Sequence, residues 1–268
     1  MLRLLLPCIL AISLGLSANA AAAPLATLIT GTQRSDANIQ RNQYRHPVQT
    51  LQFFGLKPDQ KVLEVWPGTG WYSEILGPYL RDKGVFYAAH FSPSQAQSFF
   101  QQTREDFLAK LQSRPDLYGN VKMVSLYPPA NEPLPAPANS LDLVLTFRNV
   151  HNWAKGGYDQ AMFNTFYQML KPGGFLGVVE HRAKPGTSFR QMIATGYMTT
   201  NYVIHLAQTA GFKLAATSEI NANPKDDTHH PDGVWSLPPT LRGAAIDQEK
   251  MLAIGESDRM TLKFVKPD

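Results

Sequence analysis

The chain has 268 residues, a hydrophobic content of 44% and a formal net charge of +4. This length suits one sizeable α/β domain with its own core. The excess positive charge is scattered, with no run of Lys and Arg longer than two residues, which argues against a nucleic-acid partner. Cys8 is the only cysteine and lies in an apolar N-terminal segment. The rest of the chain therefore has no disulfide, no thiol nucleophile and no cysteine-bound metal.

The first twenty residues have the pattern of an export signal. Arg3 supplies the positive charge, Leu4–Leu16 the apolar segment, and Ala18-Asn19-Ala20 the small-residue cleavage site. The apolar segment is too short to span a bilayer comfortably. We therefore expect cleavage after Ala20, no stable membrane anchor after cleavage, and a periplasmic or secreted protein. A mature chain without cysteine suits an oxidising compartment.

Residues 35–268 are predicted to form a single domain, preceded by a flexible tail over residues 21–34. The domain opens with a helical lead-in over Ser35–Gly55. This lead-in breaks at His46-Pro47, because the residue before a proline avoids the helical region.

The most informative segment follows directly. Lys61–Trp66 reads as a short buried strand, Pro67-Gly68-Thr69-Gly70 as a tight turn, and Trp71–Leu80 as a helix. A strand, a glycine turn and a helix in this order hold nucleotide-like ligands, because glycines let the ligand approach the backbone and free amides at the helix start face an anionic group. The spacing is not that of a dinucleotide fingerprint, since Ser73 stands where its third glycine would be.

The remaining segments alternate between strand and helix patterns. Strands are predicted at Val85–His90, Val121–Ser125, Leu141–Phe147, Phe175–His181, Phe212–Ser218 and Arg259–Val265, and helices at Ser94–Gln112, Tyr158–Leu170 and Thr199–Ala210. Tyr127–Ser140 contains five prolines and is predicted to be a loop. Asn221–Arg242 is a polar insertion before the last strand. The alternation predicts an α/β fold with a doubly wound, mostly parallel seven-stranded sheet.

Polar side chains gather where the predicted strands end, and ligands bind at the carboxyl ends of such strands. They are Glu64 after the first strand, His90 at the end of the second, Arg148, Asn149, His151 and Asn152 after the fourth, and His181 at the end of the fifth. Four polar side chains within five residues are hard to bury without a ligand or a hydrogen-bond network. With an ordinary pKa near ~6.5, a histidine such as His151 can take a proton from an oxygen or nitrogen nucleophile. Alternatively, Asn149 and His151 hydrogen-bond the loop itself.

The segment Glu64–Gly70, E-V-W-P-G-T-G, resembles the E/D-x-G-x-G-x-G turn of class I S-adenosylmethionine (SAM)-dependent methyltransferases, with Trp66 in place of the first glycine. R-N-V-H-N-W after the fourth strand, L-K-P-G-G-F before the fifth and A-G-F before the sixth resemble later motifs of the same family. Together with G-E-S-D-R-M-T-L, these motifs are similar to a group of exported "predicted methyltransferases". The resemblance implies a Rossmann-like fold of the class I methyltransferase type.

The resemblance also implies roles for these residues, with SAM as cofactor and a small molecule or another, unidentified, methyl acceptor as partner. Glu64, Gly68 and Gly70 would hold the methionine part, with Trp66 as an aromatic wall or a narrowing of the pocket. The remaining cofactor contacts would come from His90 at the ribose, Glu132 near the adenine, and Arg148 and Asn149. In catalysis, His151, with Asn152 and His181, would orient and deprotonate the acceptor.

Two other functions stay open. His90 replaces the acid that binds the ribose in the family, and an exported enzyme would need SAM outside the cytoplasm, so a ligand-binding module without methyl transfer is one alternative. A hydrolytic or metal-assisted enzyme using the strand-end histidines is another. We predict no metal site, because the histidines belong to separate strand ends without metal-helix spacing. Asp226, Asp227, His229 and His230 in the insertion read as a solvated loop or a lid.

Overall fold

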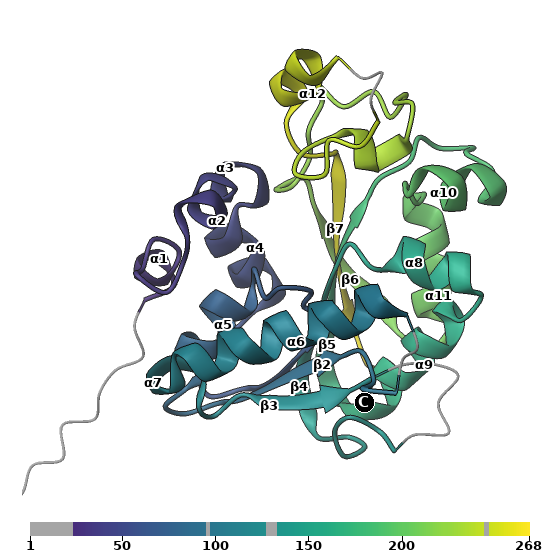
Figure 1. Ribbon diagram of the computed structural model, residues 1–268. Helices are drawn as coiled ribbons and strands as arrows, with labels where there is room; N and C mark the ends of the chain where they lie inside the picture. The colour runs from purple at the N-terminus through teal and green to yellow at the C-terminus, as the bar shows by residue number, and fades with distance from the viewer. Residues whose placement is uncertain (1–23, 95–96, 127–132, 244–246) are drawn as a thin grey trace, which may run out of the picture.

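The computed structural model describes residues 24–268 apart from 95–96, 127–132 and 244–246. A seven-stranded sheet with the order β3-β2-β1-β4-β5-β7-β6 crosses the molecule (Figure 1). Its strands are β1 (Lys61–Val65), β2 (Val85–His90), β3 (Lys122–Ser125), β4 (Leu141–Phe147), β5 (Leu170–His181), β6 (Lys213–Ser218) and β7 (Arg259–Val265). Strand β7 runs antiparallel to both its neighbours, and the pairs from β3 to β5 are parallel. The predicted fold class is confirmed.

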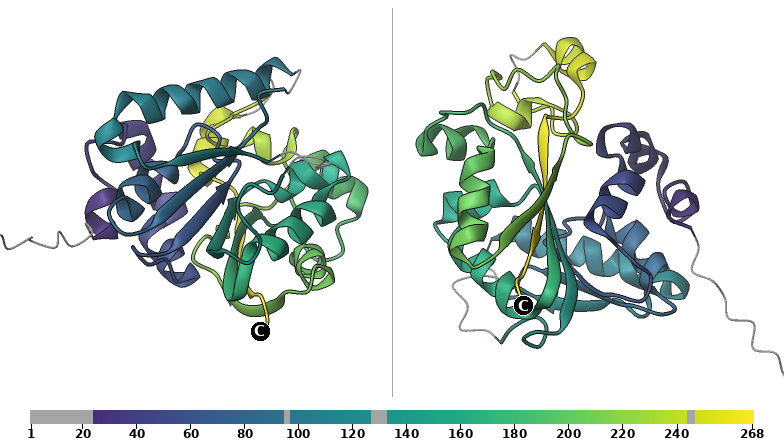
Figure 2. Two further views of the ribbon diagram at one scale, coloured as in Figure 1. Left: turned by 90° about the horizontal axis from the view of Figure 1, so that it is seen from below. Right: turned by 180° about the vertical axis from the view of Figure 1, so that it is seen from behind.

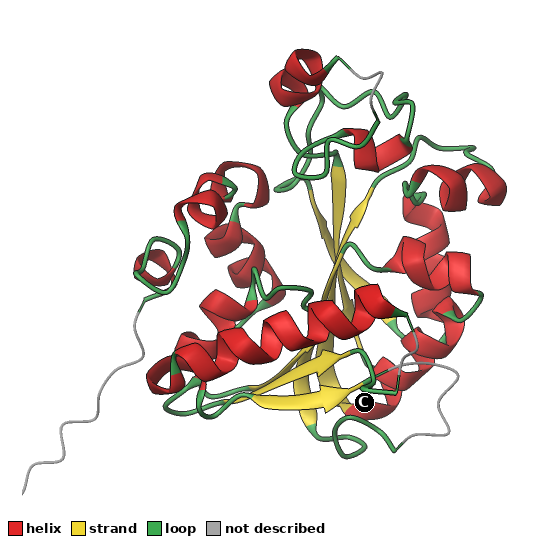
Figure 3. Cartoon of the chain, in the orientation of Figure 1, coloured by secondary structure: helices red, strands yellow, loops and turns green. Residues whose placement is uncertain are grey.

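Helices cover both faces of the sheet, as the views from below and from behind show (Figure 2). One face carries α4 (Pro47–Phe54), α5 (Ser73–Leu80), α6 (Ser98–Ser113) and α7 (Pro115–Tyr118), with α1 (Leu25–Leu28), α2 (Asp36–Gln40) and α3 (Asn42–Arg45) beside them. The other face carries α8 (Val150–Gly156), α9 (Asp159–Met169), α10 (Phe189–Thr195) and α11 (Thr200–Thr209). The short 3-10 helix η1 (Gly233–Ser236) and α12 (Gln248–Ile254) lie together at the top of Figure 3. Among the described residues, no helix has both the length and the apolar character needed to cross a bilayer.

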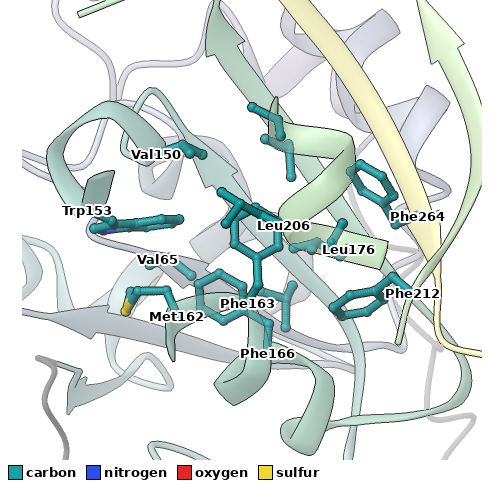
Figure 4. Packing of buried hydrophobic residues seen from close by; sticks show 14 of the residues in the cluster. Val65, Val150, Trp153, Met162, Phe163, Phe166, Leu176, Leu206, Phe212 and Phe264 are labelled. Carbon is teal, nitrogen blue, oxygen red and sulfur yellow. The ribbon is translucent and has the colours of Figure 1, made fainter. Parts of the chain in front are cut away.

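Each face of the sheet buries its own apolar cluster, as expected for strands covered on both sides. Trp153, Phe163 and Phe166 of α8 and α9 pack on one face, together with Leu176 and other residues (Figure 4). On the other face, Leu51 and Phe54 of α4 and Ile75 and Leu76 of α5 contact the sheet, and all four side chains are fully buried. The two clusters fix the sheet between helix layers, so the strand ends are held in place.

Several segments differ from the sequence-based expectations. The segment after β4, expected as a loop, becomes helix α8, which ends at Gly157 in the left-handed conformation (φ +73). Strand β5 starts at Leu170 instead of Phe175, because Leu170 already pairs with Leu141 of β4. The next pair is Leu143 with Phe175, so the residues between Leu170 and Phe175, which include Gly173 and Gly174, form a bulge in the strand. The helices α7, η1, α10 and α12 are not among the predicted elements, because each spans only four to seven residues.

The segment before residue 35 is packed where it is described, in contrast to the expected flexible tail over residues 21–34. Leu25 and Leu28 of α1 are buried in the cluster on the α5 face. The side chain of Arg34 is fully buried and its guanidinium lies 4.4 Å from the ring centroid of Trp71. The packed domain therefore includes residues 24–34. Residues 1–20, where the signal peptide is expected, lie outside the described residues.

Candidate active site

The carboxyl ends of β1, β4 and β5 meet the start of the antiparallel β7 at one edge of the sheet. A cavity of about 270 Å³ lies there, with a wall that includes Arg45, Glu64, Trp66, Gly68, Arg148, Asn149, His151, Asn152, His181, Trp235, Glu256 and Ser257. The structure thus brings together all the predicted site residues except three. Gly70 and His90 are not part of this wall, and Glu132 lies outside the described residues.

The turn after β1 has the left-handed backbone that glycine-rich turns need, although a tryptophan opens it. Trp66 (φ +46), Gly68 (φ +60) and Gly70 (φ +86) all have positive φ. A Cβ at Gly68 would meet no atom within 4 Å, so the backbone here faces open space. A Cβ at Gly70 would lie 2.9 Å from the ring of Phe107 in α6. Gly68 therefore opens the cavity, whereas Gly70 allows close packing of α6.

The side chain of Trp66 does not block the turn. Its indole Nε1 donates a hydrogen bond to the carbonyl oxygen of Leu126 at 2.8 Å, and its ring packs against Phe91, Trp153 and Tyr158. The residue is 6% exposed. The ring is therefore held by residues that follow β2, β3 and β4, and it forms part of the cavity wall.

Glu64 lies almost fully buried at the bottom of the cavity. One of its carboxylate oxygens accepts a hydrogen bond from Ser73 Oγ at 2.5 Å. Burial raises the pKa of Glu64 to about 7, because a charged carboxylate loses its hydration there. A cationic group entering the cavity would favour the ionised form of this side chain.

His90 has no ring nitrogen left to accept a hydrogen bond from a ribose. Its Nδ1 accepts a hydrogen bond from the backbone N–H of Phe91 at 2.9 Å, so Nε2 carries the proton and donates to the carbonyl oxygen of Gly68 at 3.0 Å. The ring is completely buried, and burial lowers its pKa to about 4. In this geometry His90 holds the glycine turn, which corrects the expected contact to the ribose.

His151, at the start of α8, is oriented by a buried carboxylate on the neighbouring strand. Its Nδ1 lies 3.0 Å from Oε1 of Glu180, which also accepts the backbone N–H of His181 at 2.8 Å. The other oxygen of Glu180 accepts the N–H of Val150 at 2.6 Å. With Nδ1–H donating to Glu180, the free Nε2 of His151 is the ring atom able to take a proton. This carboxylate–imidazole pair is the arrangement of an oriented general base.

His181 ends β5 next to this pair. Its ring centroid lies 5.3 Å from that of His151, and its Nδ1 shares a hydrogen bond of 2.5 Å with Ser257 Oγ. Burial, followed by the charge of neighbouring cations, lowers the pKa of His181 well below its ordinary value, so the ring is neutral. His151, Glu180 and His181 each offer a ligand atom within 4.8 Å of the others. However, the Glu180 oxygens already accept three hydrogen bonds, which favours a positioning role over metal ligation.

Of the other polar residues after β4, Asn149 hydrogen-bonds neighbouring strands, whereas Arg148 and Asn152 line the cavity. Asn149 Nδ2 donates to the carbonyl oxygen of Val65 at 3.0 Å and to Thr146 Oγ1 at 3.3 Å, so this amide ties β4 to β1. The alternative expectation, in which Asn149 hydrogen-bonds the loop itself, differs from this arrangement, because both partners of its side chain lie in strands. Asn152 is exposed and Arg148 is partly exposed, and both side chains face the cavity.

Segment 233–240 contributes one wall of the cavity. Trp235 lies with its ring 5.9 Å from that of His151, and Pro238, Pro239 and Thr240 complete this wall. The segment is held by Asp226, whose Oδ2 accepts hydrogen bonds from Tyr197 at 2.9 Å and from the N–H of Asp258 at 2.8 Å. Asp226 Oδ1 accepts from His230 at 2.8 Å. The Asp226–His230 cluster therefore attaches the insertion to the start of β7.

A second, larger cavity of about 880 Å³ lies on the other side of Trp66 and His151. Its wall combines the aromatic side chains of Phe91, Phe99, Phe100, Tyr158 and Trp235 with the charged side chains of Lys155, Asp232 and Arg242, and it shares Gly68, Asn149 and Asn152 with the first cavity. Phe99 is 69% exposed at its rim. His151 lines both cavities, and the second one contains more aromatic side chains than the first.

Sequence reasoning missed several residues of this site. Glu180 is the one acid in the apolar run of β5, and the pairing of β4 with β5 could have identified it as the partner of His151. Glu256 and Trp235 come from distant segments without a local pattern, so only the fold brings them to the cavity.

No sequence-family profile and no curated protein matches the chain. Solved structures do match it. A SAM-dependent methyltransferase from Aquifex aeolicus superposes with a TM-score of 0.53 at 19% identity, covering 68% of this chain and 87% of that one. The (4+2)-cyclase SpnF gives a TM-score of 0.57 at 16% identity, covering 91% and 92%.

Geranyl diphosphate C-methyltransferase from Streptomyces coelicolor, solved with Mg²⁺, geranyl diphosphate and S-adenosyl-L-homocysteine, gives a TM-score of 0.56 at 10% identity, covering 90% of this chain and 87% of that one. The strand order, the glycine turn after β1 and these superpositions agree. The chain has the Rossmann-like fold of the class I SAM-dependent methyltransferases.

Proposed function

We propose that this protein is a SAM-dependent methyltransferase that acts on a small-molecule acceptor. The observation that carries this proposal is the opening of the glycine turn, at Gly68, into the same cavity as the His151–Glu180 pair. A ligand held at the turn would therefore lie beside an oriented base. A cavity of about 270 Å³ suits a small acceptor better than a macromolecule.

The residues present fit the amino-acid end of SAM. Open space above Gly68 leaves room for the ligand, and Glu64 supplies a carboxylate for its ammonium group. The ribose contact from the end of β2 is missing, because both nitrogens of His90 bind the backbone. When bound, SAM supplies an electrophilic methyl group on a sulfonium. Most of the rate gain in such a displacement comes from positioning of the acceptor.

The protein's own residues supply that positioning and a proton acceptor. Glu180 fixes the ring of His151, so that Nε2 can take a proton from the acceptor's oxygen or nitrogen. Asn152 and the neutral His181 face the same cavity and can hydrogen-bond the acceptor. Trp66 and Trp235 enclose the cavity with aromatic surface, which attracts a cationic ligand by about 0.5–2 kcal/mol.

Calorimetric titration of the chain from Ala21 with S-adenosylhomocysteine tests the cofactor. We expect micromolar binding that Glu64→Gln weakens at least tenfold and that the matched control Glu249→Gln, on the exposed surface of α12, leaves unchanged. Absence of binding at millimolar ligand by a folded protein would contradict the proposal.

The role of His151 is tested next, with an acceptor found by screening small molecules for transfer of a labelled methyl group. We expect His151→Gln to reduce turnover by about 10²-fold or more, in the range of general-base catalysis, with cofactor affinity changed less than twofold. Equal losses of turnover and affinity would assign His151 to binding instead. His205→Gln, on the exposed face of α11, is the control.

We also propose that the protein works outside the cytoplasm, in the periplasm or after secretion. The N-terminal pattern of Arg3, an apolar segment and Ala18-Asn19-Ala20 supports this location. The mass of the protein purified from an exporting host should correspond to a chain that begins at Ala21. An uncleaved chain retained in the cytoplasm would contradict it.

A ligand-binding or non-methylating protein on the same scaffold is the second candidate, and the geometry of His90 favours it. The structural neighbour SpnF, described as a (4+2)-cyclase, shows that the fold is not confined to proteins described as methyltransferases. The same titration decides between the two, because this second candidate predicts no binding of S-adenosylhomocysteine.

A further inference from the structure

The arginines in the wall of the polar cavity and directly behind it outnumber the acids that face them. Arg41, Arg45 and Arg259 all form their ion pairs with a single carboxylate, Glu256. The Nε atoms of Arg41 and Arg45 lie 2.7 and 3.0 Å from its oxygens, and Nη1 of Arg259 lies at 3.1 Å. Three guanidinium groups thus share one negative charge in a buried setting.

Arg148 adds a fourth cation to this group. Within the described part of the chain, its guanidinium forms no hydrogen bond and no ion pair, although it lies in the cavity wall beside Arg45. Burial lowers the pKa of Arg148 to about 10, and its charge is the main electrostatic cause of the lowered pKa of Arg45. Arg45 is 1% exposed, and its Nη2 has no hydrogen-bond partner among the described residues. Cations held this close together with too few counter-charges repel one another, and a bound anion relieves this repulsion.

SAM would not balance this charge. Its carboxylate is offset by its ammonium group, and the sulfonium leaves a net charge of about +1 at neutral pH. Glu64, the other acid in the cavity wall, has its pKa raised to about 7 and is partly neutral near that pH. The group of arginines therefore stays positive with the cofactor bound, so an anionic second ligand would balance it.

We propose that the acceptor carries a carboxylate or phosphate group, and that this anionic group binds to Arg148 and Arg45. This inference rests on the proposed function, since it names the substrate class of that site. Arg148 directly precedes the segment that carries Asn152 and His151, so an acceptor anchored at its anionic end lies along the wall that holds the base. Guanidinium groups match the planar, two-oxygen edge of such anions.

Inorganic phosphate, titrated calorimetrically in chloride buffer at constant ionic strength, is the probe. We expect binding that Arg148→Gln weakens at least tenfold and that Arg148→Lys partly restores. Arg190→Gln removes a positive charge from the exposed surface of α10 and should change nothing. Thermal unfolding of each variant shows whether it is folded. Phosphate binding that is equal in folded wild type and Arg148→Gln would overturn the proposal.

Competition between phosphate and S-adenosylhomocysteine then shows whether the arginines bind the acceptor or the carboxylate of the cofactor. We expect saturating phosphate to change the affinity for S-adenosylhomocysteine less than twofold. If phosphate displaces S-adenosylhomocysteine but not 5′-methylthioadenosine, which lacks the carboxylate, the arginines bind the cofactor and the acceptor assignment is overturned while the proposed function stands. If S-adenosylhomocysteine does not bind but phosphate binding depends on Arg148, the proposed function fails and the anion site remains.

Discussion

At the scale of single residues, His90 shows how one side chain can replace another without keeping its role. The sequence correctly placed His90 at the end of β2, twenty residues after Gly70, but its ring serves the glycine turn and not a ligand. Only the neutral ring can do this, because Nδ1 must accept the N–H of Phe91 while Nε2 donates to Gly68. Protonation of Nδ1 would remove this acceptor, and the backbone N–H of Phe91 would lose its hydrogen bond.

The stability of the protein should therefore depend on pH through His90. The pKa of His90 is lowered to about 4 in the folded state, whereas an unfolded histidine has a pKa near ~6.5. The unfolded state thus binds more protons between these values, so the contribution is complete above about pH 6.5 and falls as the pH decreases to about 4. This single group accounts for about 3 kcal/mol of unfolding free energy over that window.

Urea unfolding at several pH values between 4 and 7.5 measures this effect. We expect the difference in unfolding free energy between wild type and His90→Gln to shrink by about 3 kcal/mol toward the acid end. His205→Gln, on the exposed surface, should follow the wild-type curve at each pH. A difference between wild type and His90→Gln that is constant across the range would show that His90 does not titrate in this way.

At the scale of elements, the buried carboxylate of Asp226 holds the insertion over residues 221–242 against the start of β7. Asp226 is 1% exposed and accepts hydrogen bonds from Tyr197, from His230 and from two backbone N–H groups, those of Thr228 and Asp258. These contacts join the insertion to α10's neighbouring loop and to the start of β7. They hold the segment that places Trp235 against the cavity.

Asp226→Asn should loosen this attachment. An amide has one oxygen where the carboxylate has two, so at least one pair of donors loses its acceptor, at a cost of about 2–4 kcal/mol. Asp227→Asn is the matched control, because its side chain is 66% exposed and its loss should cost less than about 0.5 kcal/mol. Urea unfolding measures both variants, and limited proteolysis should cut Asp226→Asn within residues 221–242 first. Equal unfolding free energies for the two variants would show that the insertion is held elsewhere.

Elements were predictable where the local pattern was strong. The strands β1, β2 and β4 are apolar runs bounded by turns, and their predicted bounds agree with the structure to within one residue. Helix α8 was missed because its first turn holds polar residues that also suit a loop, and only its packing against α9 and α10 decides between the two. The same holds for the site: His151 was visible in the sequence, whereas its pairing with Glu180 depends on the register of β4 and β5.

At the scale of the whole molecule, the two apolar clusters set where the folded domain begins. The cluster on the α5 face includes Leu25 and Leu28, so the segment expected as a tail belongs to the core. Composition misled the prediction here, because small residues surround both leucines. Arg34 continues the segment toward the cavity, where its guanidinium stacks on Trp71 and donates to that residue's carbonyl oxygen at 3.3 Å.

A chain that begins at Ser35 should therefore be less stable than one that begins at Ala21. Removing the burial of Leu25 and Leu28 alone costs about 3–6 kcal/mol, because each buried leucine contributes roughly 1.5–3 kcal/mol. Since Trp71 lines the cavity, the truncated chain should also bind phosphate and S-adenosylhomocysteine more weakly. Leu28→Ala in the longer chain should give a loss of about 2–3 kcal/mol, and Thr30→Ala, at an exposed position, less than about 0.5 kcal/mol. If both chain lengths unfold at the same urea concentration, the segment is a tail after all and does not stabilise the domain.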